Sequence, residues 1–89
     1  MDELNDLLHI VESQTGASPV VAKFLLSIIS LDKEVNINTL LTKVSSNNID
    51  KMFAVILKMK SSDKIYFETV EKIKEKQQTL EDIAPMTGL

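Results

Sequence analysis

Apolar side chains occupy nearly every position from Pro19 to Leu31. On a helix that turns by about 100° per residue, the polar side chains of Lys23, Ser27 and Ser30 share one narrow stripe. The remaining apolar arc spans about 240°, whereas a helix at a protein surface needs only about 100°. The pattern therefore predicts a helix that is covered on several sides and forms the centre of a helical domain.

The residues before this stretch predict a first helix over 2–13. Its apolar positions follow the i, i+3, i+4, i+7 spacing of one helix face: Leu4, Leu7, Leu8 and Val11. We expect Gly16 to end this helix. Ser18 and Pro19 are typical of the N-cap and the first turn of the helix that follows, which we expect to end near Leu31.

Two further helices are predicted in the middle of the chain. A short third helix over 38–44 begins at a cap formed by Asn36 or Asn38, and its expected buried face consists of Ile37, Leu40, Leu41 and Val44. A fourth helix over 49–60 follows the loop at 45–48, and its apolar arc spans about 200°. Both the second and the fourth helix thus carry more apolar surface than a small domain easily hides.

A fifth helix is clear from residue 68 to 82, where apolar positions recur every three or four residues. The preceding segment, 65–67, fits either the start of this helix or a short extended piece. The chain is therefore expected to be all-α, a compact bundle of four to five short helices. We expect one domain over 1–84, a mobile tail over 85–89, and a core that includes Leu8, Val21, Leu25, Ile28, Leu41, Phe53, Ile56 and Ile73.

Composition narrows the possible functions. The 89 residues carry a net charge of −3, and all ten basic residues are lysine. The absence of arginine argues against sequence-specific DNA recognition, because arginine makes the bidentate contacts to guanine and phosphate. The same bias towards lysine, asparagine and isoleucine is also typical of an AT-rich genome.

Catalytic and metal-binding patterns are missing from the sequence. His9 is the single histidine, there is no cysteine, and the two glycines, Gly16 and Gly88, form no phosphate-binding loop. We therefore expect no enzyme activity, no cofactor and no metal. The acidic start, 1–6, differs from a secretory signal, and no apolar run is long enough for a membrane span, which favours a cytoplasmic protein.

Lysines gather towards the end of the fourth helix. We consider Lys51, Lys58, Lys60 and Lys64 candidate contacts to an acidic partner or a phosphate backbone. The plainer interpretation is a solvated helix C-terminus, where cations complement the helix dipole. The third and fourth helices also have helix-turn-helix spacing, although the exposed start of the fourth offers Asn47, Asn48, Asp50 and Lys51 rather than a basic surface.

The two wide apolar arcs favour a homodimer built on the second and fourth helices. The expected interface residues lie towards the edges of the arcs: Phe24, Leu26, Val55 and Leu57. The competing interpretation is that the short helices of one chain wrap the second helix completely.

Three segments, 22–26, 36–41 and 50–57, resemble a small uncharacterised helical domain family of bacterial plasmids, phages and other mobile elements. The resemblance extends over 18–60. It implies a helical fold and a mobile-element origin, and it brings no assigned activity and no functional residues.

The sequence thus favours a non-catalytic protein-interaction module, an accessory or regulatory protein of a bacterial or phage system. The alternative is a small helix-turn-helix DNA-binding regulator.

Overall fold

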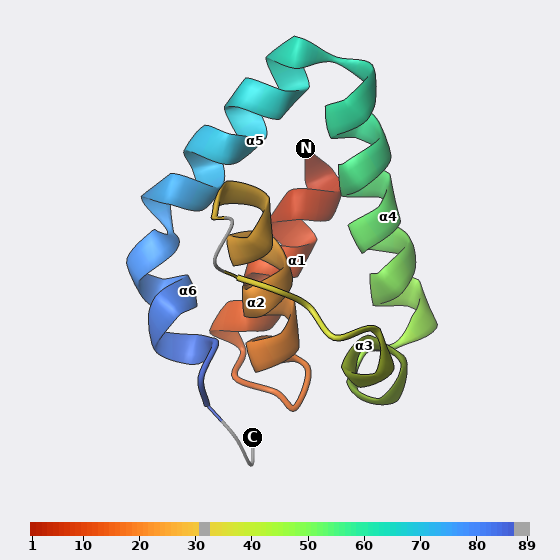
Figure 1. The fold of residues 1–89 in the computed structure, drawn as a ribbon, viewed down its shortest axis with the longest axis vertical. Coiled ribbons are helices and arrows are strands. Elements are labelled where there is room, and N and C mark those ends of the chain that lie inside the picture. Colours follow the sequence, from red (N-terminus) through yellow and green to blue (C-terminus); the bar gives the residue numbers. More distant parts are fainter. Residues whose placement is uncertain (31–32, 87–89) are drawn as a thin grey trace.

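The computed structural model describes residues 1–30 and 33–86, and every regular element in this part of the chain is a helix (Figure 1). The elements are α1 (Asp2–Glu12), α2 (Ser18–Ile29), α3 (Ile37–Lys43), α4 (Ser46–Ser61), α5 (Asp63–Glu75) and α6 (Gln77–Ile83). The all-α prediction is confirmed. The expected number of helices was too low, because the last predicted helix is divided into α5 and α6.

Helix α2 lies at the centre of the fold, as its wide apolar arc predicts. It packs against α1, α3, α5 and α6, which surround it in Figure 1. Within its first nine residues only Lys23 is exposed. The helix ends at Ile29, so the predicted end near Leu31 falls outside the described residues. The other helices of the same chain therefore cover most of this arc, and Ile28 and Ile29 near its end are half-buried.

The joint between α1 and α2 is held by a buried serine. The Ser18 hydroxyl donates a hydrogen bond to the Ile10 carbonyl at 2.6 Å and accepts one from the Thr15 N–H at 2.7 Å. Ser18 is already helical, and Ala17 occupies the N-cap position that we expected Ser18 to take. The side chain thus satisfies backbone groups from both sides of the turn instead of capping α2.

The end of α1 also differs from the prediction. The helix ends at Glu12, before Gly16, and Gln14 adopts the left-handed backbone conformation, with φ of 53°. This conformation commonly follows a helix C-terminus, where glycine usually provides it without steric cost.

Helix α3 is peripheral. Asn36 caps it by accepting a hydrogen bond from the Thr39 N–H at 3.2 Å, in agreement with one of the two predicted caps. The predicted buried face is wrong, because Ile37 and Leu41 are exposed, Leu41 by 69%. Helix α3 packs mainly against α2 and lies at the periphery of the molecule in Figure 1. Of the predicted face, Val44 just after the helix is buried and Leu40 is half-buried.

Helix α4 begins at Ser46, earlier than predicted, because Ser45 caps it by accepting a hydrogen bond from the Asn48 N–H at 3.3 Å. Its inner face contains Met52 and Val55, the helix packs mainly against α1 and α5, and α4 forms one edge of the molecule in Figure 1. Phe53 and Ile56 were expected in the core and are exposed, Phe53 by 58%. The prediction failed because α4 is covered on one side only.

A single residue joins α4 to α5. Ser62 has extended backbone angles, with φ of −150° and ψ of 123°, and its side chain accepts a hydrogen bond from the Ile65 N–H at 3.3 Å. The alternative left open for 65–67 is thereby decided in favour of helix. A second one-residue joint at Lys76 redirects the chain so that α6 packs against α2.

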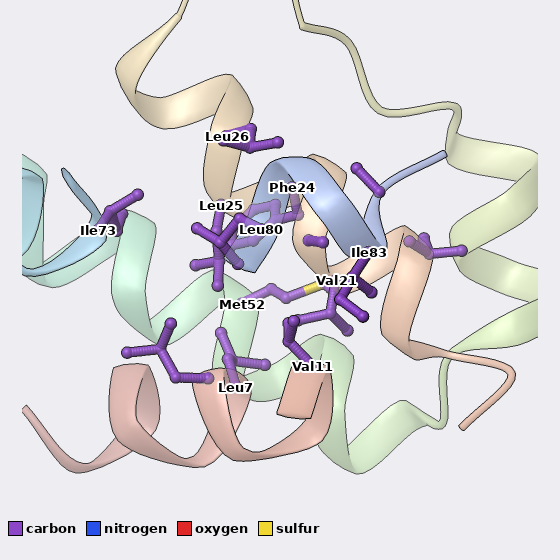
Figure 2. Close-up of a cluster of buried hydrophobic side chains, with 14 of the residues drawn as sticks. Leu7, Val11, Val21, Phe24, Leu25, Leu26, Met52, Ile73, Leu80 and Ile83 are labelled. Atoms are coloured by element: carbon purple, nitrogen blue, oxygen red, sulfur yellow. The ribbon is translucent and has the colours of Figure 1, made fainter. Parts of the chain in front are cut away.

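The hydrophobic core is formed by α1, α2, α4, α5 and α6, with Leu7, Leu25, Leu26, Ile73 and Leu80 among its most buried side chains (Figure 2). Of the predicted core, Leu8, Val21, Leu25 and Ile73 are confirmed and Ile28 is half-buried. The predicted tail begins at the exposed Pro85 and Met86, and its remainder, 87–89, falls outside the described residues.

Candidate protein-binding surface

Large apolar side chains remain exposed on the outer helices. They lie on α3, α4, the start of α5 and the end of the described chain: Ile37, Leu41, Phe53, Ile56, Leu57, Tyr66, Phe67 and Met86. Single exposed apolar residues are common on monomeric proteins, but a contiguous group of them marks a binding surface. Two such groups lie on α4 and α5, and a further exposed pair, Ile37 and Leu41, lies one turn apart on α3.

The first group forms a groove at the corner between α4 and α5, closed on its inner side by the end of α2. This corner groove has a volume of about 630 Å³ and is lined by Ile28, Ile56, Met59, Lys60, Asp63, Tyr66 and Phe67. Ile56 and Met59 come from α4, whereas the two aromatic rings come from α5. The one-residue joint at Ser62 brings these walls together, because it turns the chain sharply without a loop.

The two aromatic side chains of the corner groove contact each other. The rings of Tyr66 and Phe67 pack edge to face, with centroids 5.4 Å apart and an angle of 85° between their planes. Their neighbour Ile65 is half-buried, whereas Phe67 is 68% exposed. Three consecutive residues on a helix span about 200°, so a narrow buried face cannot cover all of them. This spacing is the signal by which the sequence points to an exposed aromatic here.

The second group lies on the outer face of α4. Phe53 and Leu57 are one helical turn apart and point away from the core, and Leu57 is 67% exposed. Asp50 precedes them by one turn and Lys60 follows them by one turn. We call the four residues Asp50, Phe53, Leu57 and Lys60 the α4 ridge.

Two of the four lysines proposed as partner contacts form ion pairs within the chain. Lys51 Nζ lies 3.3 Å from a carboxylate oxygen of Asp6, and Lys58 Nζ donates to both carboxylate oxygens of Glu3 at 2.8 Å. The hydrogen bond from Lys58 lowers the pKa of Glu3 below its ordinary value, with a smaller contribution from a backbone hydrogen bond. Within the described ranges, Lys60 and Lys64 form no ion pair. The four lysines therefore do not form one cluster, because two of them pair with α1 and the other two do not.

Most of the residues that we expected at a dimer interface are buried inside one chain. Phe24, Leu26 and Val55 belong to the core and offer no surface to a second subunit. Leu57 alone of the four is exposed. The expectation placed the interface on arc edges, whereas the available apolar surface lies on the outer face of α4 and in the corner groove.

The remaining candidate residues, those that could bind a metal ion, do not lie together in the described part of the chain. His9 is exposed on α1, and across residues 1–30 and 33–86 no three of the His, Cys, Asp and Glu side chains form a group that could hold a metal ion. In the same ranges, no helix has the length and apolar character needed to cross a bilayer. The chain matches no protein-family model, no curated protein and no solved structure.

Proposed function

We propose that this protein is a non-catalytic binding module that holds an apolar segment of another protein in the corner groove. The observation that carries this proposal is the groove itself, which is lined by Ile28, Ile56, Met59, Tyr66 and Phe67 on three different helices. Keeping these side chains in water is unfavourable, and a partner that removes them from water gains roughly 25 cal/mol per Å² of apolar area.

The chemistry of the lining defines the partner. Lys60 and Asp63 contribute one charge of each sign, so the groove does not select a strongly charged ligand. An amphipathic helix that inserts apolar side chains at i, i+3 or i+4 spacing suits an open groove of this kind. An accessory or regulatory role in a bacterial or phage system is consistent with such a module and is part of the same proposal.

DNA binding is less well supported. Lys51 and Lys58 are neutralised by α1, which leaves Lys60 and Lys64 of the four proposed contacts. Non-specific binding to duplex DNA depends on several phosphate contacts, each of which makes affinity more sensitive to salt. In addition, α3 packs mainly on α2, whereas the two helices of a helix-turn-helix pack against each other.

The test is affinity capture from the native host with three tagged proteins. The groove variant is Ile56→Ser/Phe67→Ser, and the matched control is Ile37→Ser/Leu41→Ser, which removes two exposed apolar side chains from α3. We expect a specific protein to bind the wild type and the control and to be lost from the groove variant. Circular dichroism checks that all three proteins are equally folded.

Two outcomes would contradict the proposal. One is equal capture by the groove variant, and the other is that no specific protein is retained by the wild type. Recovery of nucleic acid, with salt-sensitive binding to duplex DNA that disappears in Lys60→Ala/Lys64→Ala, would establish the DNA-binding alternative instead.

A further inference from the structure

We propose that the α4 ridge is an interface between two copies of this chain, in which α4 packs antiparallel against α4 of the partner subunit. The ridge consists of two exposed apolar residues, Phe53 and Leu57, with an acidic residue before them and a basic residue after them. This inference does not depend on the proposed function, because its apolar residues lie on the outer face of α4. Of the ridge residues, Lys60 also lines the corner groove.

The ridge has the spacing of a helix-packing seam. Its members follow each other at intervals of three, four and three residues, which is the alternation that keeps a seam facing a neighbouring helix at a small crossing angle. The pattern is also symmetric, because Asp50 and Lys60 are equally distant from Val55, as are Phe53 and Leu57. A two-fold axis level with Val55 therefore places Phe53 opposite Leu57 of the partner subunit.

The same axis places opposite charges together at both ends of the seam. Asp50 lies beside Lys60 of the partner subunit at one end, and Lys60 lies beside Asp50 of the partner subunit at the other end. A parallel arrangement would instead bring like charges together. A C2 interface is self-complementary in this way, so the charge order on the ridge favours a second copy over an unrelated protein.

The charged residues of α4 fall into two sets, one that pairs with α1 and one that lies on the ridge. Lys51 and Lys58 face α1 and are held by Asp6 and Glu3. Asp50 and Lys60 are exposed, and neither forms an ion pair with another described residue. On α4, the two charged residues without an ion pair to a described residue are thus the two that an antiparallel partner would pair.

The size of the ridge sets the expected affinity. Helix α4 has 16 residues and is about 24 Å long, so a contact along it alone falls below the roughly 1,200 Å² typical of tight complexes. We therefore expect a reversible dimer with a dissociation constant on the order of micromolar, and not an obligate one.

Sedimentation equilibrium from about 1 to 300 µM protein tests the proposal. The wild type is expected to shift from the 10.0 kDa monomer towards twice that mass. Leu57→Asp should raise the dissociation constant at least tenfold, because it places a charge in the seam of both subunits. Phe67→Asp changes an equally exposed side chain in the corner groove and should leave the dimer intact.

The charge order provides a second test that does not depend on apolar residues. Asp50→Lys and Lys60→Asp should each weaken the dimer roughly three- to tenfold, since each creates two like-charge contacts. The double variant Asp50→Lys/Lys60→Asp should recover the wild-type affinity within about twofold. An equimolar mixture of the two single variants should also associate, because every contact across its interface then joins opposite charges.

Several results would overturn this interface. They are a wild type that stays monomeric at 300 µM, a dimer that Phe67→Asp abolishes and Leu57→Asp preserves, and a double charge variant as weak as its parents. Because Phe67→Asp affects the groove and Leu57→Asp affects the ridge, loss of partner capture and loss of the dimer are distinguishable.

Discussion

Helices α2 and α4 have similar hydrophobic patterns in the sequence but are packed differently in the structure. Both have apolar arcs much wider than a surface helix needs. Four helices pack on α2, whereas α4 packs mainly on α1 and α5 and leaves Phe53 and Leu57 in solvent. A wide apolar arc therefore indicates how much of a helix surface favours burial, but it does not indicate whether other elements of the same chain bury it. For α2 the chain does so by folding α5 and α6 back over it.

The largest effect is expected from truncating the same residue type on the two helices. Leu25 on α2 is fully buried, so Leu25→Ala should lower the free energy of unfolding by about 2–5 kcal/mol. Leu57→Ala should change it by less than about 0.5 kcal/mol, because its side chain is mainly in solvent. Urea unfolding at a protein concentration well below the dissociation constant of the proposed dimer measures both.

A comparable loss for both leucines would contradict the distinction between the two helices. It would mean that Leu57 is packed in the folded monomer. Loss of cooperative unfolding in Leu25→Ala remains consistent with the prediction, because a domain of this size has only about 5–10 kcal/mol of stability to lose.

The sequence predicts α2 better than it predicts α4 for a physical reason. Lys23, Ser27 and Ser30 mark one polar stripe, so every other direction of α2 must be covered. On α4 the sequence pattern alone places Asp50, Lys51 and Lys58 on one polar stripe and so predicts that they face solvent, whereas Lys51 and Lys58 face α1 through ion pairs. Lysines that form ion pairs with a neighbouring helix look the same in the sequence as lysines in water. The direction of the core was consequently misassigned, and Phe53 and Ile56 with it.

The division between α5 and α6 was missed for a different reason. Neither glycine nor proline interrupts residues 68–82, and the break at Lys76 follows from tertiary packing. Leu80 and Ile83 are buried in the core, and they reach α2 only because the chain changes direction at this residue. The corner groove could be anticipated in part, because the consecutive apolar residues 65–67 cannot all face one core.

An intermediate effect is expected at the joint that anchors α2. Ser18→Ala should lower the free energy of unfolding by about 1–3 kcal/mol, since the Ile10 carbonyl and the Thr15 N–H, which bond the buried Ser18 hydroxyl, both lose a partner. The control is Ser27→Ala on the same helix, whose hydroxyl donates only to the Phe24 carbonyl within α2. Equal effects of the two substitutions in urea unfolding would show that the Ser18 contacts add nothing specific to the joint.

The smallest effect concerns the ion pair that ties α4 to α1. Glu3→Gln should lower stability slightly at neutral pH, and high salt should reduce the difference. Because the pKa of Glu3 is lowered in the folded chain, its contribution is present above the ordinary glutamate pKa and disappears as the pH falls through the folded value. Urea midpoints of the two proteins should therefore converge in acid. Lys60→Gln, on the outer side of α4, should leave monomer stability unchanged, and a pH-independent gap for Glu3→Gln would contradict the assignment.

The walls of the corner groove meet at Ser62 without any other non-helical residue between them. Adding or removing one residue in α4 beside this joint would rotate α5 by about 100° and shift it by about 1.5 Å, carrying Tyr66 and Phe67 out of the groove. Substitution at the lining positions alters the width and chemistry of the groove while its walls stay in place. The geometry of the groove therefore depends more strictly on the number of residues from Ile56 to Phe67 than on their identity. Exchanging side chains changes the lining of the groove, whereas a length change here removes the groove itself.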